Sequence, residues 1–152
     1  MPSPLRRASI ACGLAVALMA PAHAAEVDPR AIALERPEQI PWGPVIRDGN
    51  QQAVLVGDSA KPGFHAVMPR WLPGHVTRPH FHPNDGFIAM LSGTWWMGSG
   101  RKSDPDSTVP APAGSGVTHF ARGIHHDGVQ DRPAVLLILG EGPGTSSSAE
   151  TR

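Results

Sequence analysis

Short apolar runs separated by glycine, proline and small polar residues recur along most of the chain. Runs of this length are typical of β-strands, and the Gly and Pro residues between them are typical of turns. The expected strands are 52–56, 64–72, 87–91, 94–97, 117–121 and 134–139. The last of these is a continuous apolar run, which favours a strand buried on both faces. The pattern therefore predicts an all-β domain.

The segments between and around these runs are polar or rich in proline. Residues 98–108 predict a surface loop with room for one helical turn, and 110–114 predict a turn that leads into the next strand. Residues 25–44 contain four prolines and predict a non-helical N-terminal arm, which Trp42 would hold to the core. Residues 143–152 are rich in serine and threonine and predict a disordered tail.

The composition supports the same fold class, because 17 glycines and 17 prolines are too many for a helical protein of 152 residues. Seven or eight short strands with turns of this kind are typical of a double-sheet jelly roll. Residues 45–142 are enough for one such domain with one core.

The first 24 residues have the pattern of a signal peptide. Arg6 and Arg7 precede a short apolar run, and Ala22-His23-Ala24 forms a small-residue cleavage site. We therefore expect cleavage after Ala24, export to the periplasm or secretion, and no stable association with a membrane afterwards.

Cleavage would also change the chemistry of the chain. It removes Cys12, the only cysteine, so the mature protein has neither a disulfide nor a thiolate. It removes Arg6 and Arg7 as well, which leaves 11 of the 13 basic residues against 13 acidic ones. Because no basic block is present, we expect no nucleic-acid partner.

Two histidines two residues apart are the main chemical signal. His80 and His82 would point to the same face of an extended strand. Neutral imidazole nitrogen suits Zn, Cu, Fe and Ni, so the pair is half of a transition-metal site. His125 and His126 lie downstream, where a neighbouring strand could complete it. His65 and His75 have no such spacing, and we expect them to be structural or exposed.

This segment resembles the first motif of the cupin superfamily, which runs Gly, five residues, His, one residue, His, three or four residues, Glu, six residues, Gly. Gly74, His80, His82 and Gly93 keep that register, whereas Gly86 stands at the Glu position. The second motif is degenerate. Gly114 and His125 hold its separation, but its Pro and second Gly are replaced by Phe120 and Arg122.

The resemblance implies a cupin-type jelly-roll β-barrel with His80, His82 and His125 as ligands of one divalent transition metal (Fe, Mn, Ni, Cu or Zn). His126 and His119 remain alternatives for the third ligand, although His126 would face the other way on a regular strand. The resemblance also implies a homodimer.

The glycine at the acidic position has a chemical consequence. An all-imidazole site keeps the full 2+ charge of the ion, which favours a small anionic molecule as its ligand. Asp85 could replace the missing carboxylate only if a β-bulge turned it inward, because it lies one residue early.

Three functions are compatible with this sequence. An enzyme of the oxygenase, isomerase or decarboxylase type would use His119 or His126 as proton carrier. A binding module would hold a metal or a small anionic metabolite without turnover. A purely structural cupin is disfavoured by the retained histidines of the first motif. His119 could equally be an ordinary half-buried strand residue.

Overall fold

The computed structural model describes residues 26–46 and 49–150, which divide into two compact units at residue 34. Within the first unit, residues 26–34 contain a turn beside an ion pair between Asp28 and Arg30 (2.9 Å). Among the described residues, no helix has the length and apolar character to cross a membrane. The predicted signal peptide, residues 1–24, lies outside the described part of the chain.

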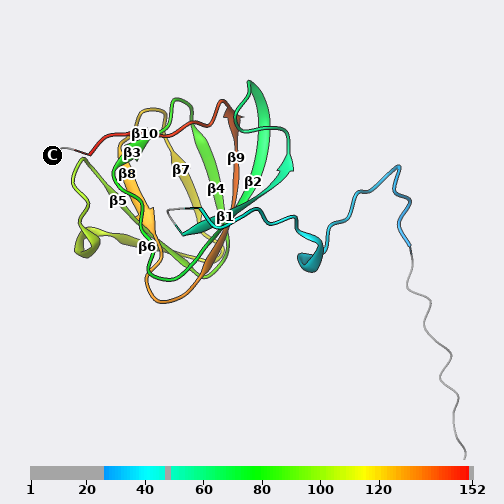
Figure 1. Cartoon of the computed structure of the whole chain (residues 1–152), viewed down its shortest axis with the longest axis horizontal. Helices are drawn as coiled ribbons and strands as arrows, with labels where there is room; N and C mark the ends of the chain where they lie inside the picture. The colour runs from blue at the N-terminus through cyan, green and yellow to red at the C-terminus, as the bar shows by residue number, and fades with distance from the viewer. Residues whose placement is uncertain (1–25, 47–48, 151–152) are drawn as a thin grey trace, which may run out of the picture. The chain divides into compact units, whose positions relative to one another are not determined.

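From residue 35 onward, the described residues form two five-stranded antiparallel sheets that face each other as a jelly-roll sandwich (Figure 1). The first sheet has the order β1 (Asn50–Val56), β2 (Gly63–Trp71), β9 (Ala134–Gly142), β4 (Gly86–Ser92), β7 (Gly116–His119). The second has the order β10 (Ser147–Ser148), β3 (His80–Phe81), β8 (His125–Gly128), β5 (Thr94–Ser99), β6 (Val109–Pro112). Two one-turn 3-10 helices accompany them, η1 (Pro37–Gln39) and η2 (Pro105–Ser107). The predicted all-β jelly roll is confirmed.

All six strands expected from apolar runs are present, and η2 is the helical turn expected in the polar loop. The strand β6 was expected to be a turn, because its sequence VPAP contains two prolines. It forms at the edge of its sheet, beside β5, and an edge strand tolerates residues that donate no backbone hydrogen bond.

The segment expected to be a disordered tail differs from that prediction over the residues that the structure describes. Ser147–Ser148 forms β10, which pairs with β3. The N–H of Ala149 donates to the carbonyl of Pro79 (2.8 Å), and the Ala149 side chain is buried. A segment rich in serine and threonine buries too little apolar surface to form a hydrophobic core. It can still form a strand at a sheet edge such as β10, because that requires only backbone hydrogen bonds.

The hydrophobic core lies between the two sheets. Its members are Trp71, Ile88, Met90, Trp95, Ala111, Val129, Ala134 and Leu136. Leu136 on β9 is fully buried, whereas its neighbours Val135 and Leu137 are only half-buried. The outer face of β9 is therefore less covered than its continuous apolar sequence predicted.

The turn between β4 and β5 requires glycine at position 93. Gly93 has a φ of +76°, a left-handed conformation that other residues adopt at a cost. A Cβ there would also overlap the carbonyl oxygen of Pro133. The turn expected at this position is thus determined by the requirement for glycine at position 93 as well as by the pairing of the strands.

Truncating the central core residue tests the importance of this packing. We expect Leu136→Ala to lower the free energy of unfolding by about 2–5 kcal/mol, because it removes buried methyl groups and leaves a cavity. Urea denaturation followed by circular dichroism measures the change. Leu137→Ala on the half-buried face is the control, and an equal loss in both variants would contradict this description of the core.

The N-terminal arm contacts the first sheet through residues that follow η1. The guanidinium of Arg70 on β2 lies 4.4 Å from the ring centroid of Trp42, at the distance of a cation–π contact. The N–H of Gly43 donates to the carbonyl of Gln52 on β1 (2.9 Å). The contact that Trp42 makes with the domain is therefore with the side chain of Arg70, whereas the sequence predicted a contact with the core.

Candidate metal centre

Three histidine rings converge at one end of the second sheet. His80 on β3 pairs directly with His125 on β8, and His82 follows two residues after His80. One ligand nitrogen of each of the three lies within 4.8 Å of the others. The ring centroids are 4.4 Å apart for His80 and His125, 5.1 Å for His80 and His82, and 5.3 Å for His82 and His125. The two motifs thus bring together the three residues that they predicted.

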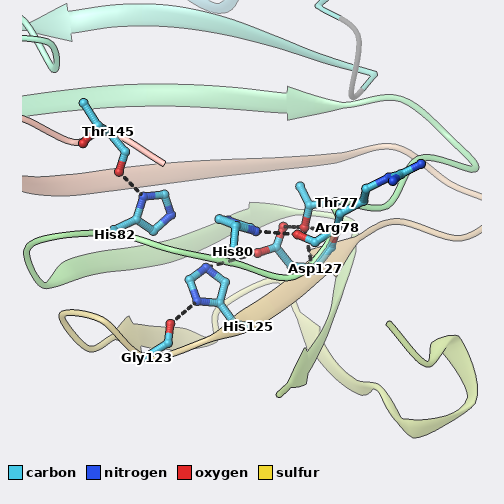
Figure 2. A network of polar contacts seen from close by, with 8 residues as sticks. All are labelled: Thr77, Arg78, His80, His82, Gly123, His125, Asp127 and Thr145. Carbon is cyan, nitrogen blue, oxygen red and sulfur yellow. Dashed lines mark hydrogen bonds and ion pairs between the residues drawn. The ribbon is translucent and has the colours of Figure 1, made fainter. Parts of the chain in front are cut away.

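Each of these rings is oriented by a backbone carbonyl (Figure 2). The Nδ1 atoms donate to the carbonyls of Arg78 (2.8 Å, from His80), Thr145 (3.0 Å, from His82) and Gly123 (2.9 Å, from His125). A carbonyl oxygen can only accept, so each Nδ1 carries the proton and each Nε2 offers a lone pair. Metal-binding histidines are commonly oriented in this way.

The electrostatics of the cluster favour neutral imidazoles. Burial, with smaller effects from the charges of His80, His82 and His126, lowers the pKa of His125 to about 4, against the opposing effect of its bond to Gly123. Burial also lowers the pKa of His82. The Nε2 atom of His125 is buried and has no hydrogen-bond partner. Because metal ligands must be deprotonated, these residues fit a divalent transition metal.

His119 lies beside the cluster, at the end of β7. Its ring centroid is 3.7 Å from that of His125 and 5.4 Å from that of Trp95, and its plane is nearly parallel to that of His82 at 6.3 Å. Burial, followed by the charges of the three neighbouring histidines, lowers its pKa to about 3. His119 is thus a neutral base within reach of anything bound at the cluster.

Asp127 is a member of this site that the sequence analysis missed. Its carboxylate is buried, accepts from the Thr77 hydroxyl (3.2 Å), and lies 3.7 Å from Nε2 of His125. Burial raises the pKa of Asp127 to about 7, although the bond from Thr77 opposes this. His119, His125 and Asp127 form a second group whose ligand atoms lie within 4.8 Å of one another. Asp127 lies two residues after His125, on the same face of β8, and this spacing was the signal in the sequence that could have identified it.

His126 is not brought to the cluster. It points to the other face of β8, where a Cβ at Gly98 would overlap its ring. The N–H of Asp104 approaches its Nε2 (3.5 Å). Alternation along the strand explains this position.

Comparison with known proteins gives a fold but no close relative. No protein-family model and no curated protein matches the sequence. An RmlC-like cupin from Shewanella frigidimarina matches with a TM-score of 0.55 and 15% identity over 70% of this chain and 87% of that chain. A cupin-like protein from Thermotoga maritima matches with a TM-score of 0.55 and 16% identity, over 67% and 77%. This chain has the cupin fold.

A further structure with this fold is the polyketide cyclase RemF from Streptomyces resistomycificus. It matches with a TM-score of 0.64 and 14% identity over 80% of this chain and 87% of that chain. At such identities the likeness shows the fold alone. The cupin resemblance predicted from the histidine spacing is therefore confirmed, and the chemistry must be argued from the site.

The position at which the cupin motif has its acidic residue is open in this chain. Apart from Gly86 and its two chain neighbours, no described residue places a heavy atom within 4 Å of where a Cβ of Gly86 would stand. Asp85 does not fill the gap, because its carboxylate accepts from the N–H of Ala121 (2.6 Å) and belongs to neither group of candidate ligands. The three-histidine cluster of this chain thus has space beside it where the cupin motif has a carboxylate.

That space belongs to a pocket of about 150 Å³, which is lined by His82 of the cluster and by residues of the first sheet. Its walls include His82, His119 and Gly86 at one end, and its apolar surface comes from Val67, Ile88, Ile138 and Leu139. His65 also lines it. Sequence reasoning expected His65 to be structural or exposed, whereas it is only 5% exposed and borders the pocket.

Proposed function

We propose that this protein is an exported cupin that holds one divalent transition metal through Nε2 of His80, His82 and His125. It binds a small anionic molecule at that centre. The observation that supports this most strongly is the set of three Nδ1–carbonyl bonds, which leave Nε2 unprotonated in three rings whose ligand atoms lie within 4.8 Å of one another. The buried, unpartnered Nε2 of His125 supports the same assignment, because such an atom costs stability unless something binds it.

The anionic class of the ligand follows from charge. Three neutral imidazoles leave the charge of a divalent ion uncompensated, and Gly86 contributes no carboxylate. Asp127 lies 3.7 Å from Nε2 of His125 but is not one of the three grouped ligands, and burial raises the pKa of its carboxyl to about 7, which favours the neutral form. A bound divalent ion would supply Lewis-acid or redox chemistry. The protein's own contribution is the apolar wall of the pocket, together with His119, whose neutral imidazole would hydrogen-bond to the bound molecule.

We favour ligand binding, with or without turnover, over metal sequestration. A sequestering protein would complete the coordination shell with its own side chains. Here Asp85 is committed to the backbone of Ala121, and His126 lies on the far side of β8. If the protein is an enzyme, it would be of the oxygenase, isomerase or decarboxylase type, with His119 as the proton carrier.

The first test is the metal content of the protein purified without a histidine tag from its native compartment, measured by elemental mass spectrometry. We expect about one Fe, Mn, Ni, Cu or Zn per chain. A folded protein that contains no metal and refuses added divalent ions would contradict the proposal.

Restoring the acidic residue of the motif tests the open position. We expect Gly86→Glu to keep the metal but to weaken binding of a small carboxylate such as pentanoate by about tenfold, because the new carboxylate repels the anion and occupies its space. Calorimetric titration of the Zn²⁺-loaded protein measures the change.

Gly86→Gln is the matched control, since it adds a similar volume without charge. Equal weakening in both variants would show that bulk rather than charge excludes the anion. Unchanged binding in both would place the anion elsewhere.

A further inference from the structure

The pocket beside the metal centre contains a buried polar side chain that the proposed function does not use. His65 lies on β2, in the opposite sheet from His80 and His125, and its imidazole lines the same pocket as His82 and His119. It is only 5% exposed, and its Nδ1 is buried without a hydrogen-bond partner. This is an imidazole at the pocket wall with unused hydrogen-bonding capacity.

The surrounding backbone leaves room for the ring. A Cβ would lie 3.4 Å from Cε1 of His65 at Gly140 and 3.3 Å from the same atom at Gly144. Both distances are at or below the lower end of ordinary contact, so a side chain at either position would crowd the ring. Two glycines on separate segments thus leave room for this imidazole at the pocket wall.

An unpartnered buried nitrogen is unfavourable in the free protein. A neutral imidazole has one donor and one acceptor nitrogen, and a buried polar atom without a partner loses its hydration with no compensation. A polar group of a ligand would supply the missing partner once the pocket wall moves enough to admit it, because this nitrogen has no exposed surface in the free protein. A purely apolar ligand would not.

The charges around the pocket indicate which polar group this is. Asp85 and Glu141 contribute the charged side chains among the lining residues, and no lysine or arginine lines the pocket. A second anionic group in the pocket would be repelled by these carboxylates. A neutral carbonyl or hydroxyl group would not be repelled, and either can pair with an imidazole.

We infer that His65 is a specificity residue that hydrogen-bonds a neutral carbonyl or hydroxyl oxygen of a short-chain carboxylic acid whose carboxylate lies at the three-histidine centre. The inference rests on the proposed function. A pocket of about 150 Å³ fits a molecule of this kind, since a protein cavity of that size holds a benzene molecule.

Two acids that differ only in one ketone oxygen test this inference. We expect the Zn²⁺-loaded protein to bind 4-oxopentanoate about tenfold more tightly than pentanoate in calorimetric titrations. His65→Phe should abolish that preference while retaining pentanoate binding and zinc content. His75→Phe, a matched change away from the pocket, should keep it.

A measurement on the unaltered protein guards against misfolding of the variant. The side-chain ¹⁵N resonances of His65 should shift on addition of 4-oxopentanoate and much less on addition of pentanoate. Equal affinities for the two acids in the unaltered protein, or a preference that survives in His65→Phe, would overturn the inference alone. Failure to bind zinc, or zinc binding with no affinity for either acid, would overturn the proposed function and this inference with it.

Discussion

Replacing His82 with alanine should lower the metal affinity by at least about 100-fold, so that the purified variant contains almost no metal. The change removes one of three ligand nitrogens, and loss of a ligand should exceed the 10–100-fold effect typical of residues that only orient ligands. Elemental mass spectrometry and competition with a chromogenic zinc chelator measure the loss. Circular dichroism checks that the sheets are retained.

His75→Ala is the matched control for this experiment. His75 is five residues before His80, and its Nδ1 approaches the carbonyls of Leu72 (3.2 Å) and Pro73 (3.0 Å) rather than the cluster. We expect its metal content to equal that of the unaltered protein. Full metal content in His82→Ala would refute the ligand assignment.

Ending the chain after Gly144 should weaken metal binding by about 10–100-fold without removing any ligand. The truncation removes the carbonyl of Thr145, which accepts from Nδ1 of His82. It also removes β10, the edge partner of β3, and so loosens the strand that begins with His80. Chelator competition on the truncated protein measures the effect.

Glu150→Gln separates this effect from a simple loss of charge. It removes only the exposed ion pair between Arg78 and Glu150 (3.1 Å), and exposed ion pairs contribute little. Its affinity should match that of the unaltered protein. A truncated protein that binds metal as tightly as the full chain would mean that the ring of His82 is held without this segment.

The parts of the fold that the sequence predicted are those where the hydrophobic effect leaves a repeating pattern. The apolar runs that became β1, β2, β4, β5, β7 and β9 were all identified in this way. The strand β8, which was expected only from its histidines, reads His-His-Asp-Gly, and all four residues are buried. Burial of polar residues leaves no apolar signal. Here it occurs because one face of the strand forms the candidate site.

The candidate site was predictable to the extent that spacing determines position. His80 and His82 share a face because they are two residues apart, and the same alternation turns His126 away from His125. Asp127 was overlooked although the same spacing marks it, because it lies two residues after His125 on β8. His65 was missed for a different reason. Its place in the site depends on which strands face each other across the sandwich, and a single sequence contains no local signal for that pairing.

The hydrogen bond from His82 to Thr145 has a consequence for how this domain would gain its metal. The candidate site joins segments around residues 80, 125 and 145, which are far apart in sequence and lie on three different strands or the loops beside them. In an unfolded or partly synthesised chain, these histidines would not be held together as a three-ligand site for free metal ions. The folded domain would therefore select the metal, in the compartment where folding is completed.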